Sequence, residues 1–188
     1  MAGSGLAVDA AVLVKPTNFF VLGASFIHQA NPFSAHTLEE GYTSAYPGVE
    51  FRCTAGDWRL SGLMANIMIS LAPEQIPGLS FDLELKGGFP KYHFPRIVIT
   101  AEYQGAIETI TQEADPTRAG TFGAGFGLSY RFNQRWALTA GVSYVQGNPS
   151  FSTVTTSNFG PSAYYGYDQK VTSVNLCGGL RFIIVRPK

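Results

Sequence analysis

Charge is scarce in this chain of 188 residues. Only 14% of the residues are charged, whereas ordinary soluble domains carry roughly 25%. The 13 Lys and Arg residues balance the 13 Asp and Glu residues, so the chain lacks the basic surplus that attracts nucleic acid. A protein surrounded by water relies on surface charge for solubility. The deficit therefore favours an outer surface in hydrocarbon and excludes nucleic acid as an expected partner.

Long hydrophobic runs are also missing. No stretch approaches the ~18 to 20 apolar residues of a transmembrane helix, because polar residues interrupt the apolar segments at alternate positions. The stretch MAGSGLAVDAAVLVK does not match a signal peptide, since it has no early Lys or Arg and Asp9 interrupts its apolar part. Either the chain is not exported or a leader has been removed; we favour the second explanation.

Residues that hold metals or carry catalysis are few. Cys53 and Cys177 lie far apart and show no CxxC or Cys/His metal spacing, so we expect free thiols and no metal. The histidines are His28, His36 and His93, and the chain contains no GxSxG nucleophile motif. We therefore predict no enzymatic activity, no cofactor and no metal site.

What the chain does have is alternation, seen best in Thr121–Tyr144. Every second residue is apolar or aromatic from Phe122 to Tyr130 and again from Trp136 to Tyr144, on either side of a turn at Asn133-Gln134. The residues between them are Gly, Ala, Ser, Thr and Arg. Because side chains alternate between the two faces of a strand, one face of this hairpin is apolar with aromatic ends. A soluble sheet buries such a face, whereas a membrane barrel turns it outward to lipid.

The same period recurs along the whole chain. It predicts strands near Leu6–Lys15, Asn18–His28, Val49–Thr54, Asp57–Leu71, Leu79–Gly88, Pro95–Ile107, Thr121–Phe132, Arg135–Gln146 and Lys170–Val185. Most of these are longer than the roughly 5 to 6 residues of globular strands, and they suit the roughly 9 to 11 residues of a strand that crosses a bilayer. Strand length thus also favours a membrane barrel.

The connections between these strands alternate in length. The short ones are Pro16-Thr17, Ala55-Gly56, Phe89–Phe94 and Asn133-Gln134, and the long ones are Gln29–Gly48, Glu108–Gly120 and Gly147–Gln169. Short periplasmic turns and long extracellular loops are typical of outer-membrane barrels. We therefore predict an all-β fold in one domain over residues 1–188: an antiparallel transmembrane β-barrel of about eight to ten strands.

Closure of such a barrel raises a question. Nine predicted strands make an odd number, and the short first turn makes the first strand run from the extracellular side. A missing upstream strand, an additional pairing of Phe151–Thr156, or a parallel closure would each resolve this. Unpaired backbone groups in lipid cost several kcal/mol each, so we expect closure by this chain or by a partner.

Charged residues of the inward phase are expected to gather in the lumen. The predicted cluster consists of Lys15, Arg59, Asp82, Glu84, Lys86, Arg96, Glu102, Arg131, Arg135 and Arg181. A ring of Arg and Lys would make an anion-preferring constriction. A small barrel is instead filled by its own side chains, and buried charges must be paired, so we favour a salt-bridged plug.

Aromatic residues near the short turns are expected to form an interfacial belt. They are Trp58, Phe89, Tyr92, Phe94, Phe132 and Trp136. Core aromatics of a soluble sheet are the alternative. A change of phase in Asp57–Leu71 predicts a β-bulge near Gly62–Asn66 or a strand buried on both faces. The loops Tyr42–Gly48 and Asn148–Asp168 are rich in tyrosine and form either a binding surface for a partner or glycan or a folded crown.

The hairpin GAGFGLSYRFNQRWALTAGVSY, with the strand pattern around it, resembles bacterial outer-membrane β-barrel proteins. The segment VDAAVLVKPTNFFVLGASFIHQANPF is similar to a hairpin in barrels associated with type IX secretion and gliding. The resemblance implies a Gram-negative outer membrane, contact with its lipid, and an envelope protein partner or oligomer.

The expected function is thus a non-enzymatic structural or adaptor barrel in an envelope assembly. One alternative is a narrow anion-preferring pore for small solutes, and another is a soluble β-barrel that binds an apolar ligand.

Overall fold

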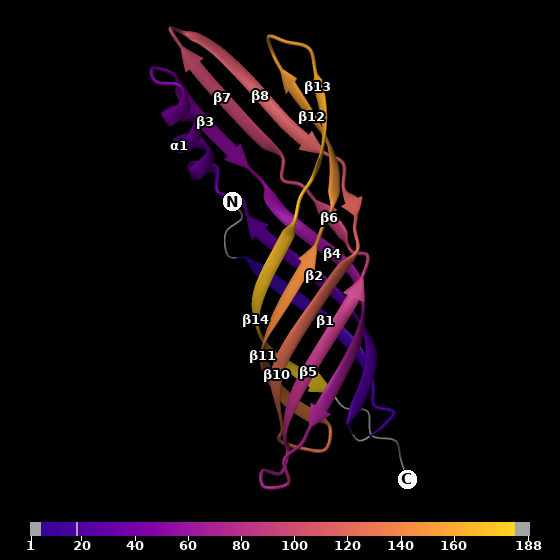
Figure 1. The fold of residues 1–188 in the computed structure, drawn as a ribbon. Helices are drawn as coiled ribbons and strands as arrows, with labels where there is room; N and C mark the ends of the chain where they lie inside the picture. Colours follow the sequence, from indigo (N-terminus) through magenta and orange to yellow (C-terminus); the bar gives the residue numbers. More distant parts are fainter. Residues whose placement is uncertain (1–4, 18, 183–188) are drawn as a thin grey trace.

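The computed structural model describes residues 5–17 and 19–182. Strands dominate it, and they form two sheets that meet end to end (Figure 1). One sheet curls into a nearly closed barrel, and the other stands at one end of that barrel beside a single described helix. The predicted all-β class and the barrel-like sheet are therefore confirmed.

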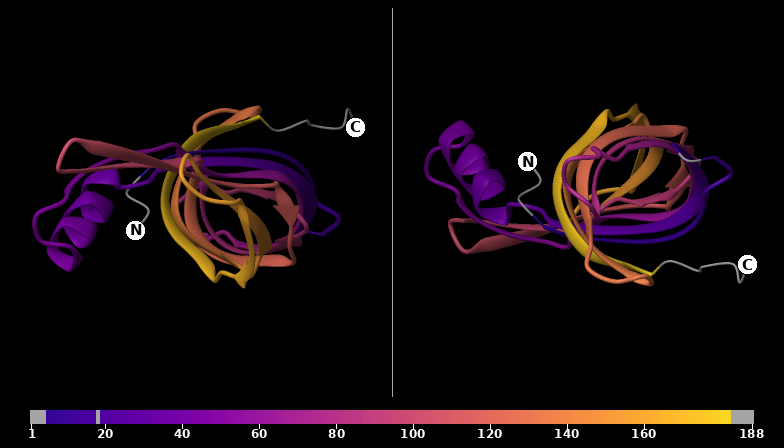
Figure 2. Two further views of the ribbon diagram at one scale, coloured as in Figure 1. Left: turned by 90° about the horizontal axis from the view of Figure 1, so that it is seen from above. Right: turned by 90° about the horizontal axis from the view of Figure 1, so that it is seen from below.

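Seven strands make the path of the barrel sheet, each antiparallel to its neighbours. In order they are β1 (Leu6–Val14), β2 (Phe20–Pro32), β4 (Asp57–Leu71), β5 (Leu79–Gly88), β10 (Thr121–Arg131), β11 (Trp136–Gly147) and β14 (Val171–Phe182). Two short strands, β6 (Lys91–His93) and β9 (Thr117–Arg118), extend the sheet beside β4. Viewed along its length, the sheet curls into a ring (Figure 2). This path has fewer strands than the eight to ten that we predicted.

The second sheet has five strands, in the order β13 (Ala163–Asp168), β12 (Ser150–Ser157), β8 (Ala106–Ala114), β7 (Ile97–Tyr103) and β3 (Glu50–Ala55). Helix α1 (Ala35–Ala45) packs beside β3. Much of this sheet comes from segments predicted as long loops. Phe151–Thr156 does pair, within β12, but in this second sheet, so it adds no strand to the barrel path.

The two ends of the barrel sheet differ. The connections after β1, β4 and β10 lie at one end, called here the short-turn end, and the second sheet lies at the other. Two of the predicted short turns are wrong. Ala55-Gly56 is not a hairpin turn, because the chain passes there from β3 in the second sheet into β4 in the barrel. Phe89–Phe94 lies at the second-sheet end and contains β6.

The predicted alternation of faces holds around the barrel sheet. On the hairpin of β10 and β11, Phe126 and Val142 are paired and lie outside, 45% and 40% exposed. Ser129 and Ser143 point inward and are 4% and 9% exposed. On this hairpin the outer face is therefore apolar, and the inner face is small and polar.

Strand β4 keeps one phase throughout, so the predicted bulge is wrong with respect to β2. Its pairing with β2 runs without a break from Ile69 to Asp57. On the other side its partner changes from β6 to β5 around Gly62, where a Cβ would lie 2.6 Å from Pro90 Cα. Glycine is needed here because the neighbouring backbone comes so close.

A hydrophobic core lies where the two sheets meet. It comprises Ile27, Trp58, Leu60, Met64, Tyr92, Val145 and Phe151. The Trp58 ring packs edge-on against Phe94 and Phe151, with centroids 5.3 and 5.5 Å away. Since these side chains come from both sheets, they close the second-sheet end of the barrel interior and fix one sheet on the other.

Candidate functional site

The barrel interior holds an ion-pair network around Lys86. Strand alternation turns Lys86 inward from β5, where its side chain is only 5% exposed. Its Nζ atom lies 2.7 Å from Asp9 Oδ2 on β1 and 3.3 Å from Glu84 Oε2 on its own strand. The buried ammonium is thus paired with two carboxylates, as burial of a charge requires.

A second ion pair lies on Asp82, also on β5. Arg181 Nη2 of β14 is 3.0 Å from Asp82 Oδ2, and Ser129 Oγ donates to the same oxygen over 2.6 Å. Arg181 also approaches Met68 Sδ, at 3.9 Å. Because β14 and β5 are not neighbours in the sheet, this pair bridges the barrel across its interior.

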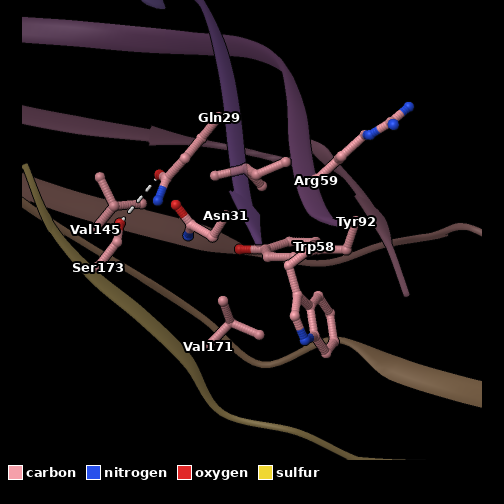
Figure 3. A pocket seen from close by; sticks show the side chains of 9 residues that line it. Gln29, Asn31, Trp58, Arg59, Tyr92, Val145, Val171 and Ser173 are labelled. Carbon is pink, nitrogen blue, oxygen red and sulfur yellow. Dashed lines mark hydrogen bonds between the residues drawn. The ribbon is translucent and has the colours of Figure 1, made fainter. Parts of the chain in front are cut away.

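Neutral polar pairs occupy the interior closer to the core. Ser25 Oγ donates to Asn66 Oδ1 over 3.2 Å, and Ser173 Oγ donates to Gln29 Oε1 over 3.2 Å. Figure 3 shows the second pair beside a cavity of about 20 Å³, which Trp58 also lines. A space of this size holds about one water molecule, so the interior is nearly filled at this level.

The predicted lumen cluster is only partly assembled. Asp82, Glu84, Lys86 and Arg181 lie inside, as expected. The other predicted members lie elsewhere. Lys15, Arg131 and Arg135 are exposed at the short-turn end, and Arg59 is exposed beside Asp57 at the second-sheet end. Glu102 belongs to β7 of the second sheet, and Arg96 lies in the segment that leads into β7. Arg96 pairs there with Glu113 over 2.6 Å. In place of a basic ring at one end, the interior holds Lys86 between two carboxylates and the pair of Arg181 with Asp82.

Three residues that point into the barrel were not among the predicted site residues. Asp9, Asn66 and Gln29 all have the inward phase of their strands. Strand phase was the available signal, but Asp9 was interpreted only as an interruption of an apolar stretch.

The predicted aromatic belt is divided between the two ends of the barrel. Phe132 and Trp136 are exposed at the short-turn end, where Trp136 packs on Phe182 with centroids 5.0 Å apart. Phe89 is exposed at the second-sheet end. Three predicted members belong elsewhere: Trp58 and Tyr92 are buried in the core, and Phe94 packs against it. They were misplaced because Ala55-Gly56 and Phe89–Phe94 were predicted as turns of the short-turn end.

The second sheet carries an open groove of about 820 Å³. Tyr42 and Tyr46 at the end of α1 lie 5.4 and 6.1 Å from the Phe51 ring and form one wall. Tyr103, Phe159 and Tyr165 also line it and are exposed. The tyrosine-rich segments thus form a folded crown at this end.

The histidines and cysteines are spread over several elements in the described part of the chain, and His28 and His93 are close enough to interact electrostatically. His36 faces Glu40 on α1 at 3.6 Å, and His28 is exposed on the outer face of β2. Cys53 and Cys177 are free thiols. Residues 5–17 and 19–182 contain no group of three or more His, Cys, Asp or Glu side chains placed to hold a metal ion.

No helix among the described residues has the length and apolarity to cross a membrane. Comparison of the chain with family models, with curated proteins and with solved structures gives no match.

Proposed function

We propose that this protein is a non-enzymatic β-barrel of the bacterial outer membrane and serves as a structural or adaptor component of an envelope assembly. The observation that carries the proposal is the apolar outer face of the barrel sheet. Every strand on the barrel path exposes large apolar side chains on that face, for example Val12 on β1, Ile67 on β4, Leu83 on β5 and Leu176 on β14.

Such a surface suits lipid and is unfavourable in water. Soluble monomers rarely expose contiguous apolar patches above a few hundred Å², whereas a membrane barrel has an apolar band about 25 Å tall between aromatic girdles. Aromatic residues flank the outer face of β10, with Phe122 at one end and Tyr130 at the other. At about 3.4 Å per residue, they are roughly 27 Å apart along the strand, or about 20 Å along the axis at the usual tilt.

The filled interior favours a structural barrel over a pore. A pore that prefers anions needs cations free to meet solute, but Lys86 and Arg181 are both paired with carboxylates. The core around Trp58 and Phe151 lies across the second-sheet end. A soluble barrel for an apolar ligand is less favoured still, because ionic groups lie in the interior and large apolar side chains cover the outer face.

The two tryptophans of the chain offer a direct test of lipid contact. Trp136 is 40% exposed on the outer face, whereas Trp58 is 7% exposed in the core. In vesicles whose acyl chains carry bromine, we expect quenching of Trp136 fluorescence, which Trp136→Phe abolishes and Trp58→Phe leaves in place. A chain that stays monodisperse without detergent, and whose tryptophans bromine does not quench, would refute the membrane assignment.

Conductance across a planar bilayer separates the structural barrel from the pore. The paired interior predicts no stable current from the folded protein. A stable anion-selective current that falls on Arg181→Ala would overturn the structural assignment in favour of the pore.

A further inference from the structure

The barrel sheet ends at two strands that do not pair with each other. Its path begins at β1 and finishes at β14, and among the described residues no ladder joins these two strands. They leave a seam along the barrel wall. In lipid, each unpaired backbone N–H or C=O group at such an edge costs several kcal/mol, so the seam needs an occupant if the barrel lies in a membrane.

Strand direction restricts what can occupy the seam. Seven strands that are antiparallel in succession place the first and the last in the same direction. β1 and β14 therefore cannot pair antiparallel with each other. One strand running the opposite way would pair antiparallel with both and would bring the wall to an even number of strands, which closed antiparallel barrels require.

Exposure at the seam indicates that a neighbour is missing there. Asp9 on β1 and Cys177 on β14 have the inward phase and yet are exposed, whereas Asn66 and Ser129 of the same phase are 3% and 4% exposed. The outward Leu176 is 90% exposed, more than any other large apolar residue described on the wall. Both faces of the two edge strands thus lack the cover that an adjacent strand provides.

Other occupants fit less well. Each remaining strand of residues 5–17 and 19–182 is already paired in the second sheet or beside β4. A second copy in the same membrane would be related by an axis along the membrane normal, which preserves strand direction. Its edges would therefore meet this seam in parallel and would still leave an odd count in each barrel wall.

We propose that the seam binds one extended strand of a partner polypeptide, which runs antiparallel to both β1 and β14. This is strand addition at a sheet edge, in which main-chain hydrogen bonds give affinity and alternate side chains give specificity. The strand spans roughly 9 to 11 residues. Its outward residues are apolar, to continue the face of Val12 and Leu176, and its inward residues are small, because the ion pairs of Lys86 and Arg181 occupy the interior. The inference rests on the proposed function and names the kind of partner.

A probe strand is available in the chain itself. β11 runs in the required direction, and its sequence WALTAGVSYVQG alternates large apolar and small residues. We would include this peptide during reconstitution of the full protein into vesicles. The matched control is the same peptide with two prolines at its centre, because proline cannot donate to a ladder.

Two measurements report on the seam. Hydrogen exchange follows the amides of β1 and β14, and alkylation follows the exposed Cys177 in a Cys53→Ala background. Burial and the Glu39 carboxylate raise the pKa of the Cys53 thiol, so Cys53 should react slowly. The wild-type chain should therefore show the same fast alkylation of Cys177 as the Cys53→Ala variant. With free peptide at ten times its Kd, both rates should fall by about tenfold, and the proline peptide should leave them unchanged.

Three results would overturn the proposal. Failure of the β11 peptide to slow either rate would do so, and so would slow exchange of β1 and β14 with no peptide present, which would mean that the seam is already closed. Chemical cross-linking of two copies through Cys177 would assign the seam to a second copy. Quenching of Trp136 by brominated lipid is measured on the same vesicles. If quenching persists while the peptide fails, only the seam proposal falls; if quenching is absent, the membrane assignment falls too.

Discussion

At the residue scale, Asp82 is the most constrained group of the interior. Its side chain is 6% exposed, it receives Arg181 at 3.0 Å, and it accepts from Ser129. Its other oxygen, Oδ1, is buried without a hydrogen-bond partner in the described residues. A carboxylate in this position depends on one guanidinium, so the two residues should behave as a unit.

Asp82→Asn is expected to destabilise the folded barrel because it leaves Arg181 without its carboxylate. Breaking a buried pair costs about 3–5 kcal/mol, and the 30% exposure of the Arg181 side chain reduces this to roughly 2–4 kcal/mol. Denaturant unfolding from vesicles measures the change. Arg96→Gln is the matched control: it breaks an exposed pair with Glu113 and should cost below about 1 kcal/mol. Equal costs for the two variants would contradict the inferred role of burial.

Tyr167 predicts how the crown responds to alkaline pH. Burial raises the pKa of its phenol from 10.0 to about 12, and its ring packs against Phe94 and Phe151. A group whose pKa is raised on folding contributes stability that is fully present below its unfolded pKa. The contribution is therefore present below about pH 10 and is lost as the pH rises through about 12. The absorbance titration of wild type minus Tyr167→Phe should show one phenol with a midpoint near 12; a midpoint near 10 would show that this ring is solvated.

At the element scale, alternation predicted the faces of strands better than it predicted their partners. The hairpin of β10 and β11 has nearly the predicted boundaries, because its turn and its long alternating runs are both local signals. The segment Pro95–Ile107, predicted as one strand, is instead β7, a tight turn and the start of β8. The turn has positive φ at Gln104 and Gly105. Such turns usually have Asn, Asp or Gly at the first of these positions, so glutamine gave no signal for a turn. Which sheet β3 and β7 join depends on long-range pairing, which periodicity does not encode.

The turn between β7 and β8 allows a direct test of the positive φ at Gly105. Gly105 has φ +82°, and nothing lies within 4 Å of the position where its Cβ would be. Gly105→Ala should therefore lower stability through the backbone alone, by about 1–2 kcal/mol. Gly160→Ala is the matched control, because its site is equally open and its φ is not in the left-handed region. Hydrogen exchange of the β7 and β8 amides measures the effect; no difference between the two variants would contradict the turn geometry.

At the scale of the whole molecule, the inner and outer faces of the barrel are inverted relative to a soluble protein. Its ionic groups pair inside, and its apolar side chains cover the outside. The interior residues Asp82 and Lys86 were predictable from strand phase, whereas the core at the junction of the two sheets was not, because Trp58 and Phe151 meet only after the chain has folded.

Because large apolar side chains cover the outside of the barrel, a charge introduced on the outer face tests whether that face meets lipid or water. Leu83 lies on the outer face of β5, midway along the wall, paired with Ile69 and Phe126, and is 50% exposed. A Lys near the bilayer midplane of a barrel costs about 2–4 kcal/mol, whereas a surface substitution in water is usually within about 0.5 kcal/mol. Leu83→Lys should therefore lower the free energy of unfolding in vesicles by about 2–4 kcal/mol. Phe159→Lys, on a crown residue that is 71% exposed, should cost far less, because the crown stands outside lipid in the proposed arrangement. Both variants are compared by denaturant titration in the same vesicles, and near-neutral values for both would place the outer face in water.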